Sequence, residues 1–259
     1  MTAQLKSTSQ GQTLILTLSD PVLRNAMGPD IYAAGIEALS VAETNPDIHS
    51  VIITGEGAHF CAGGNLNRLN ANRERPPEVQ AQSIEAMHNW MEAIRTFPKP
   101  VIAAVEGAAA GAGFSLVLMC DFVVAAADSV FVMAYSNIAL SPDGGASWNL
   151  ARALPRQLAS ELLMLGERIT PARLQTFGLV NRVVDSGHAL SEALQLAERL
   201  NARAHNSISS IKELLNDAQT NSMTHQLAQE RHHFVNNLHH INGGIGIQTF
   251  INKETPRYK

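Results

Sequence analysis

The 259-residue chain has little of what marks secreted or nucleic-acid-binding proteins. It contains two cysteines, Cys61 and Cys120, which are too few for a disulfide framework and lack metal-site spacing, so we expect two small core residues in a reducing compartment. The 19 Lys and Arg residues are scattered and the formal net charge is −4, so no nucleic-acid partner is expected. The opening "MTAQLKSTSQG" has no apolar run, which indicates no signal peptide and a cytoplasmic protein.

Long uncharged apolar runs are also absent. The most apolar segment, 101–127, is interrupted by Glu106 and Asp121, which leaves 14 residues between them without a charge. A membrane-spanning helix needs roughly 20 such residues. The segment has the pattern of a strand, a Gly/Ala turn, a short helix at 112–119 and a second strand, so it predicts buried core and no membrane partner.

Alternating strand and helix patterns account for most of the chain, which at 45% hydrophobic residues is long enough for a large core. We expect strands at 12–19, 51–54, 100–107 and 178–185, and a β-rich segment at 131–140. We also expect helices at 28–44 and 83–97, a polar connector at 70–80, and consecutive helices in the last third. The fold class is therefore α/β, with a core at 1–195 and a C-terminal helical region at 196–259.

Two side-chain clusters favour ordinary structural roles. Met87, Trp90 and Met91 have helical spacing, which is more typical of core packing than of contact with a ligand. The histidines at 232, 233, 239 and 240 lack the i, i+4 spacing of a helical metal pair, so no metal is expected.

Two glycine-rich loops, at 61–65 and 107–113, each follow a β-rich run. A dinucleotide fingerprint is excluded because Leu116 stands where its third glycine belongs. A Walker phosphate loop is excluded because neither loop contains lysine. Two such loops can each direct one backbone N–H at a shared oxygen, although tight turns packed against helices are the simpler alternative.

The order of three motifs, "HFCAGGNL", "KPVIAAVEGAAAGAGFSLVLMCDFVVAAADSVF" and "NIALSPDGGASWNLAR", resembles the crotonase family of acyl-CoA hydratases and isomerases. The resemblance runs from "RNAM" at 24–27 to the closing "TFINKETPRYK". It implies a spiral of ββα units with a C-terminal helical region that assembles into trimers or hexamers. It also implies an acyl-CoA substrate, with coenzyme A as part of that substrate and no separate cofactor.

The family's common intermediate is a thioester enolate, whose oxygen is stabilised by two backbone N–H groups. The resemblance places these donors at Gly64 and Ala112, the latter near the N-terminus of the helix 112–119. The other positions that it places at the acyl-CoA site are Arg24, Ala26, Ala62, Tyr135, Asn137 and Lys253. Core packing of Tyr135 and Asn137, and surface exposure of Arg24 and Lys253, remain open alternatives.

The acid/base residues depart from the hydratase pattern. Hydratases of the family carry two glutamates that hold a water, and Ser115 and Tyr135 occupy these positions here. Asp143 in "SPDGGAS" resembles the acid that precedes a Gly-Gly pair in double-bond-shifting and ring-oxepin isomerases. We therefore expect isomerisation through an enolate, with Asp143 carrying the proton. Hydration of a 2-enoyl-CoA, a non-catalytic acyl-CoA binder, and a turn or N-cap role for Asp143 are the alternatives.

Overall fold

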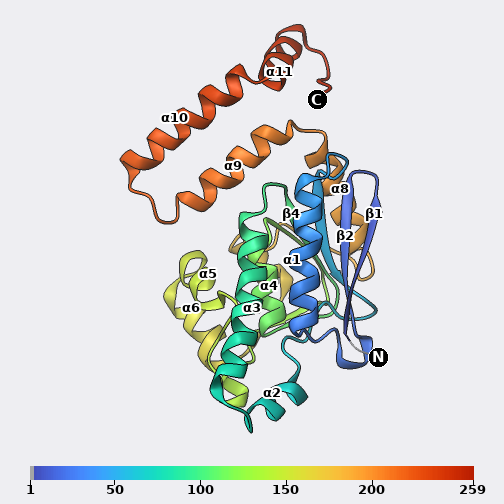
Figure 1. Ribbon diagram of the computed structural model, residues 1–259, viewed down its shortest axis with the longest axis vertical. Helices are drawn as coiled ribbons and strands as arrows, with labels where there is room; N and C mark the ends of the chain where they lie inside the picture. Colours follow the sequence, from blue (N-terminus) through green and yellow to red (C-terminus); the bar gives the residue numbers. More distant parts are fainter. Residues whose placement is uncertain (1–2) are drawn as a thin grey trace.

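The computed structural model describes residues 3–259 (Figure 1). Its strands are β1 Gln4–Gln10, β2 Thr13–Ser19, β3 Ser50–Gly55, β4 Val101–Val105, β5 Ala108–Ala110, β6 Phe122–Ala126, β7 Val130–Val132, β8 Arg168–Ile169 and β9 Arg182–Val184. Its helices are α1 Pro29–Thr44, α2 Leu66–Asn72, α3 Pro77–Thr96, α4 Ala112–Met119, α5 Ala146–Ala153, α6 Arg156–Ser160, α7 Pro171–Thr176, α8 Ala189–Asn201, α9 His205–Asp217, α10 Met223–His239 and α11 Ile241–Asn252.

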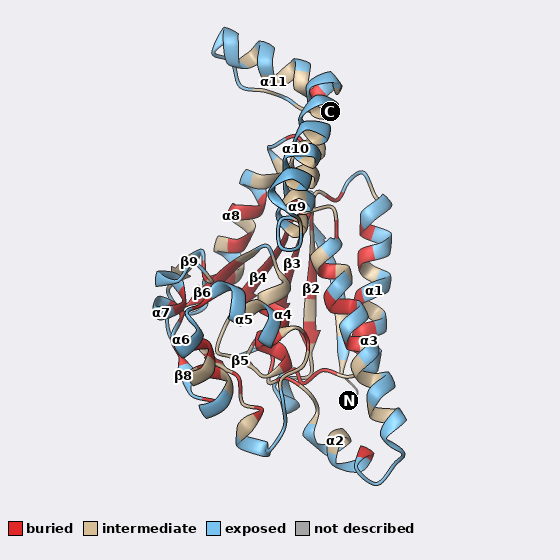
Figure 2. Ribbon diagram, turned by 90° about the vertical axis from the view of Figure 1, so that its left-hand side faces the viewer, coloured by how far each residue is buried: buried red, intermediate tan, exposed pale blue. Residues whose placement is uncertain are grey.

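A six-stranded sheet in the order β1-β2-β3-β4-β6-β9 forms the centre of the chain, parallel except for the β1–β2 pair. Helices cover both faces of the sheet, α1 and α3 on one side and α8 on the other (Figure 2). Successive residues of β3 therefore enter different layers: Val51 and Ile53 pack in the α1/α3 core, and Ile52 packs against α8. Because both faces are buried, β3 and β4 are continuously apolar.

A second sheet of three strands, β5-β7-β8, lies beside the first and positions the two glycine-rich loops. Cys61 forms an isolated parallel bridge with Ala109 of β5, and its N–H and C=O bond to Ala108 and Ala110. The first glycine-rich loop is thereby joined to the strand that leads into the second. This pairing brings loops that are about 45 residues apart in the sequence to one place.

The structure confirms the main sequence expectations for the core. The segment 101–127 contains β4, β5, α4 and β6, and α4 has the bounds predicted for it. Within the described residues, no helix combines the length and apolarity required to cross a membrane.

Four segments differ from what the sequence predicted. Of the strand expected at 178–185, only Arg182–Val184 pairs in the sheet, as β9. The sequence did not indicate β1, which is polar and mostly exposed and pairs with β2 at the edge of the sheet. The connector at 70–80 is shorter than expected, because α3 begins at Pro77, where a proline suits the first helical turn. The β-rich segment 131–140 is a strand only to Val132 and then turns at Ser136–Ile138, so Tyr135 lies outside the strand.

The last three helices extend away from the sheet (Figure 1). α9 contacts α3, whereas α10 and α11 contact mainly the neighbouring C-terminal helices. The predicted division at residue 195 falls within α8, which packs on the sheet through Ala193 and Ala197. α10 and α11 expose large apolar side chains: Met223, Leu227, Phe234, Val235, Leu238, Ile241, Ile247, Phe250 and Ile251.

Candidate active site

A cavity of ≈ 480 Å³ opens between the two glycine-rich loops, one face of α3 and the segment 134–143. Six of the predicted site residues line it: Ala62, Gly64, Ala112, Tyr135, Asn137 and Asp143. They come from three separate parts of the chain: the first loop, the start of α4 and the segment 134–143. The structure therefore brings both predicted N–H donors and the predicted acid to a single cavity.

Gly63 allows the two loops to approach each other closely. Its φ of +94° lies in the region that favours glycine, and a Cβ there would lie 2.7 Å from the carbonyl oxygen of Ala110 and 3.3 Å from the nitrogen of Ala112. A side chain at this position would separate the loops. Backbone packing thus fixes the spacing between the donors on either side.

The N–H groups of Gly64 and Ala112 donate to no acceptor within residues 3–259, while both residues line the cavity. Ala112 is the first residue of α4, so its N–H has no partner inside the helix and carries the positive end of the helix dipole. On the other loop, hydrogen bonds from Met27 to Gly63 and from Asn65 to Met27 hold the chain on either side of Gly64. Two free donors that face one cavity can stabilise an oxyanion.

Asp143 is hydrogen-bonded to Tyr135 and Ser115, the two residues that the sequence resemblance aligns with the hydratase glutamates. The Tyr135 hydroxyl donates to Oδ1 of Asp143 at 2.6 Å, and the Ser115 hydroxyl donates to the Asp143 carbonyl at 3.1 Å. The Asp143 side chain does not cap α5, whose N-cap residue is Gly145. The turn geometry depends on Gly144, where φ is +57° and a Cβ would lie 2.9 Å from Cβ of Ser115. The Asp143 carboxylate is therefore directed to the cavity and not to a helix end.

Burial shifts the titration of both groups in this pair. Burial raises the pKa of Asp143, and the Tyr135 hydroxyl and the neighbouring His88 imidazole offset part of the rise. Burial and the adjacent Asp143 carboxylate raise the pKa of Tyr135 well above its usual value, so the phenol stays protonated. A carboxylate with a raised pKa accepts a proton more readily near neutral pH.

The structure adds four lining residues on α3 that the sequence did not indicate, and it places Met87, for which the sequence favoured core packing, among them. Gln80, Ser83, Ile84, Met87 and His88 of α3 follow helical i, i+3 and i+4 spacing along one wall of the cavity. His88 reaches the acidic loop, where its Nε2 accepts a hydrogen bond of 3.3 Å from Gly144 N–H. The spacing was visible in the sequence, but it gave no means of distinguishing a cavity wall from core.

Trp90 and Met91, on the same helix, are buried and do not line this cavity, as core packing predicted.

Three predicted positions lie outside the cavity in the single chain. Arg24 is exposed, but its carbonyl accepts a hydrogen bond of 2.9 Å from Ala62 N–H, which places it beside the first loop. Ala26 is buried nearby. Lys253 follows α11 at the far end of the molecule and is exposed.

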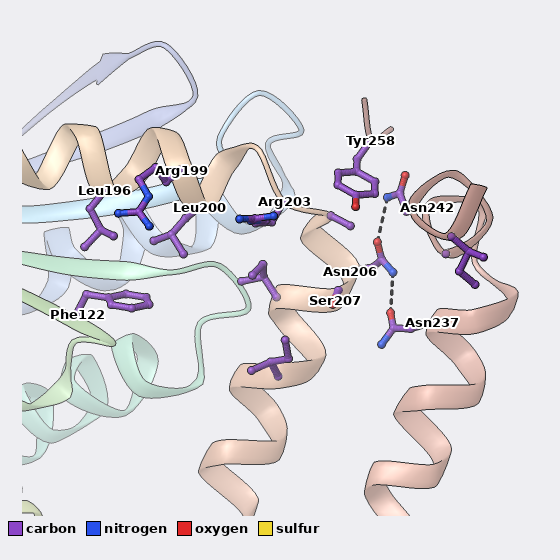
Figure 3. A pocket seen from close by; sticks show the side chains of 16 residues that line it. Phe122, Leu196, Arg199, Leu200, Arg203, Asn206, Ser207, Asn237, Asn242 and Tyr258 are labelled. Carbon is purple, nitrogen blue, oxygen red and sulfur yellow. Dashed lines mark hydrogen bonds between the residues drawn. The ribbon is translucent and has the colours of Figure 1, made fainter. Parts of the chain in front are cut away.

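A larger cavity of ≈ 610 Å³ lies between α8 and the C-terminal helices (Figure 3). Asn206 donates to Asn237 at 2.6 Å and accepts from Asn242 at 3.0 Å, which links α9, α10 and α11 across it. No carboxylate or imidazole lines this cavity. It therefore lacks the groups for proton transfer, and the described residues also contain no cluster of metal ligands.

Comparison with known proteins agrees with this geometry. A family model described as Enoyl-CoA hydratase/isomerase matches residues 8–259. The 1,2-epoxyphenylacetyl-CoA isomerase of Escherichia coli K12 is 34% identical over 246 residues, 95% of this chain and 94% of the relative. The 2,3-dehydroadipyl-CoA hydratase of the same strain is 32% identical over 257 residues, 99% of each chain.

The fold is shared with solved structures. The crystal structure of an enoyl-CoA hydratase from Polaromonas sp. JS666 superposes with a TM-score of 0.98 and 69% sequence identity, and covers 98% of this chain and 99% of that one. The expected fold, a mixed α/β core followed by C-terminal helices, is therefore confirmed.

Proposed function

The chain belongs to the enoyl-CoA hydratase/isomerase family of enzymes, also called crotonases, and from this membership we propose that it isomerises an unsaturated acyl-CoA with Asp143 as the proton carrier. The proposal uses the groups that line the ≈ 480 Å³ cavity. The thioester oxygen accepts hydrogen bonds from Gly64 and Ala112, and the acyl chain passes Asp143. Coenzyme A is part of the substrate, and no separate cofactor enters the reaction.

The proposed reaction requires one acid/base group. The Asp143 carboxylate takes a proton from the carbon next to the thioester and leaves a dienolate whose charge rests on the thioester oxygen. The two N–H donors stabilise this charge. Asp143 then returns the proton to the γ-carbon, so the double bond moves toward the thioester with no water or electron consumed.

One observation carries the proposal: Asp143 is the only Asp or Glu that lines the cavity in the described part of the chain. Water addition in hydratases of the family uses two glutamates, and the resemblance aligns Ser115 and Tyr135 with those two positions. This cavity therefore lacks the second carboxylate that such a reaction needs. The relatives named above include an isomerase and a hydratase, so the family alone does not choose between the reactions.

The test supplies matched 3-enoyl-CoA and 2-enoyl-CoA substrates to the wild type and to Asp143→Asn. We expect the wild type to isomerise the 3-enoyl substrate faster than it hydrates the 2-enoyl substrate. The Asn variant should lose about 10² to 10⁴-fold in isomerisation, because it keeps the shape of the side chain without its basic oxygen. Robust hydration that survives the substitution would identify the chain as a hydratase with another base.

The proposal extends to assembly and location. The apolar side chains exposed on α10 and α11 indicate that a second copy covers them, and we expect a homotrimer or hexamer with the helical region as its interface. In such an assembly Lys253 reaches the coenzyme A of a neighbouring site, and Arg24 reaches that of its own chain. The free thiols of Cys61 and Cys120 are consistent with a cytoplasmic enzyme.

A further inference from the structure

The active-site cavity extends well beyond Asp143 along α3. His88 lies at the acidic loop, and Gln80, which also lines the cavity, is eight residues nearer the N-terminus of the helix. At a helical rise of 1.5 Å per residue, these positions are about 12 Å apart along the axis. Ile84, Met87 and Leu69 line the space between them. The wall is therefore apolar in its middle and polar at its far end.

The far end contains Arg68, the only Lys or Arg that lines the cavity in the described part of the chain. Its Nη2 donates to Ser83 Oγ at 2.9 Å, while Nη1 lies against Gly28 and donates to no protein atom among residues 3–259. No carboxylate of the described chain lies within ion-pair distance of the guanidinium. A half-buried guanidinium whose partners, Ser83 and Tyr32, are both neutral retains most of its capacity to bind an anion.

The groups around Arg68 are also donors. Gln80 Oε1 is occupied by a hydrogen bond of 2.7 Å from Asn72, which leaves the amide N–H groups of Gln80 unpaired within the described chain. Burial raises the pKa of Tyr32 to about 12, although the charge of Arg68 and a hydrogen bond with its guanidinium lower the value in part, so the hydroxyl is neutral and keeps its proton. Ser83 Oγ accepts from Arg68, and its own proton is unassigned to any described acceptor. Donors therefore outnumber acceptors around Arg68, and Asp143, whose charge also raises the pKa of Tyr32, is the only carboxylate that lines the described part of the cavity.

We infer that Arg68, with Ser83, Gln80 and Tyr32, forms a subsite for a carboxylate at the far end of the acyl group. The preferred substrates are then CoA thioesters of unsaturated dicarboxylic acids. A carboxylate accepts two parallel N–H bonds from a guanidinium and supplies the anion that Arg68 lacks. This inference rests on the proposed function in one respect: the proposed reaction places the thioester end of the substrate near Asp143 and thus the other end of the acyl group near Arg68.

A purely structural role for Arg68 gives a different expectation. The side chain also borders an outer groove with Pro29 and Arg75, and its contacts join α2 to α3. If it served only to connect these helices, its replacement would weaken the protein and affect all acyl-CoA substrates equally. A carboxylate subsite instead changes the preference between substrates that differ only at the distal end.

The kinetic test compares matched pairs, 3-hexenoyl-CoA with 3-hexenedioyl-CoA and 3-octenoyl-CoA with 3-octenedioyl-CoA. We expect the wild type to favour the dicarboxylic member of at least one pair by about 10 to 100-fold in kcat/KM. Arg68→Met should remove or reverse this preference, mainly through KM, and Arg68→Lys should retain part of it. Arg75→Met is the matched control, because it removes the same charge from the outer groove only. It should leave the preference unchanged.

Binding of saturated analogues tests the subsite without turnover. Calorimetry with adipoyl-CoA and hexanoyl-CoA should show tighter binding of adipoyl-CoA to the wild type and equal binding to Arg68→Met. The binding measurement remains informative even if neither enoyl substrate is isomerised. Absence of isomerisation would overturn the proposed reaction but not the carboxylate subsite. Equal binding of the two analogues to the wild type, with equal binding of the suberoyl and octanoyl esters, would overturn the subsite. A preference that persists in Arg68→Met would overturn it as well.

Discussion

The Tyr135 hydroxyl and the Asp143 carboxylate form a hydrogen bond of 2.6 Å at the centre of the active-site cavity. The bond occupies Oδ1, and Oδ2 of Asp143 accepts no hydrogen bond within the described chain. Tyr135, which the sequence resemblance aligns with a hydratase glutamate, therefore holds one oxygen of the acid and leaves the other without a protein donor. The Ser115 hydroxyl lies 3.3 Å from the Tyr135 oxygen, so both substituted positions support Asp143.

Replacing Tyr135 by Phe should move the acid limb of the pH–rate profile upward. Burial already raises the pKa of Asp143, and the Tyr135 hydrogen bond lowers it in part, so loss of the bond raises the pKa further. The basic form is then lost at a higher pH as the solution is acidified. A pH profile of kcat/KM measures this shift, which would be missing if the hydroxyl only filled space.

Replacing Asp143 by Asn should leave the fold intact and increase thermal stability near pH 7. The folded-state pKa of Asp143 is raised, so ionisation of the buried carboxylate destabilises the native state as the pH rises through that value. The amide has no such charge. Thermal melts at pH 4 and pH 7 should show the gain at pH 7 and little at pH 4. A lower Tm at pH 7 would contradict this assignment of the buried charge.

Introducing proline at Ala112 should abolish turnover while the helix still forms. Ala112 is the first residue of α4, a position that tolerates proline, and proline has no N–H to donate. Loss of one oxyanion donor reduces kcat by about 10² to 10³-fold. Ala112→Gly keeps the N–H and serves as the control, with circular dichroism to compare the folds. Normal turnover by a folded proline variant would disprove the assignment of this donor.

Replacing Lys212 by Met should loosen α9 from the core. Lys212 is 7% exposed and donates to Asp121 at 2.7 Å and to the carbonyl of Ile94 at 3.1 Å. Its loss leaves Asp121, whose side chain is 24% exposed, with Val101 N–H as its remaining donor and no cation, so the free energy of unfolding should fall by about 1 to 3 kcal/mol at pH 7. Burial raises the pKa of Asp121, so the loss should shrink at low pH, where its carboxyl is protonated.

The exposed ion pair between Lys6 and Glu56 supplies the control for this measurement. Solvent and salt screen such a pair, so Lys6→Met should leave the denaturation midpoint nearly unchanged. A similar loss in both variants would show that the Lys212 pair has no special role.

Replacing an exposed apolar residue of α10 by a charged one should dissociate the proposed oligomer. Phe234 is 70% exposed in the single chain, and burial of a charge in its place would be unfavourable at an interface. We expect sedimentation to show a trimer or hexamer for the wild type and smaller species for Phe234→Glu. Val22→Glu changes a side chain that is 89% exposed on the core and should not alter assembly. A monomeric wild type at micromolar concentration would rule out this interface.

The sequence predicted the parts of the site that depend on local chemistry. Glycine pairs and β-rich runs located both loops, and the bounds of α4 followed from one short apolar run. Asp143 was identified through the resemblance of "SPDGG" to the motif in which family isomerases carry an acid before a Gly-Gly pair. These features need only a few neighbouring residues to be recognised.

Other features depend on contacts between distant segments. Arg68 belongs to a polar stretch whose composition predicts solvent exposure. It lines the cavity because α2 packs against α3. The turn that separates Tyr135 from β7 replaces a strand that its composition favoured, because the chain must direct the phenol toward Asp143. β1 was not predicted because its residues are polar and mostly exposed. It forms by backbone pairing with β2 at the edge of the sheet, which leaves no apolar pattern in the sequence.

The two loops meet closely at Gly63, so the groups proposed to bind the thioester belong to the main chain, whereas the groups proposed to move the proton are side chains. The donors proposed for the thioester oxygen are main-chain groups, so substitutions at Ser115, Tyr135 and Asp143 can alter proton transfer without removing them. A chain built this way can exchange one chemistry for another through a few side chains while its affinity for coenzyme A esters persists. The main-chain arrangement that depends on the whole fold is retained, and a new activity requires changes only in the side chains that carry the proton.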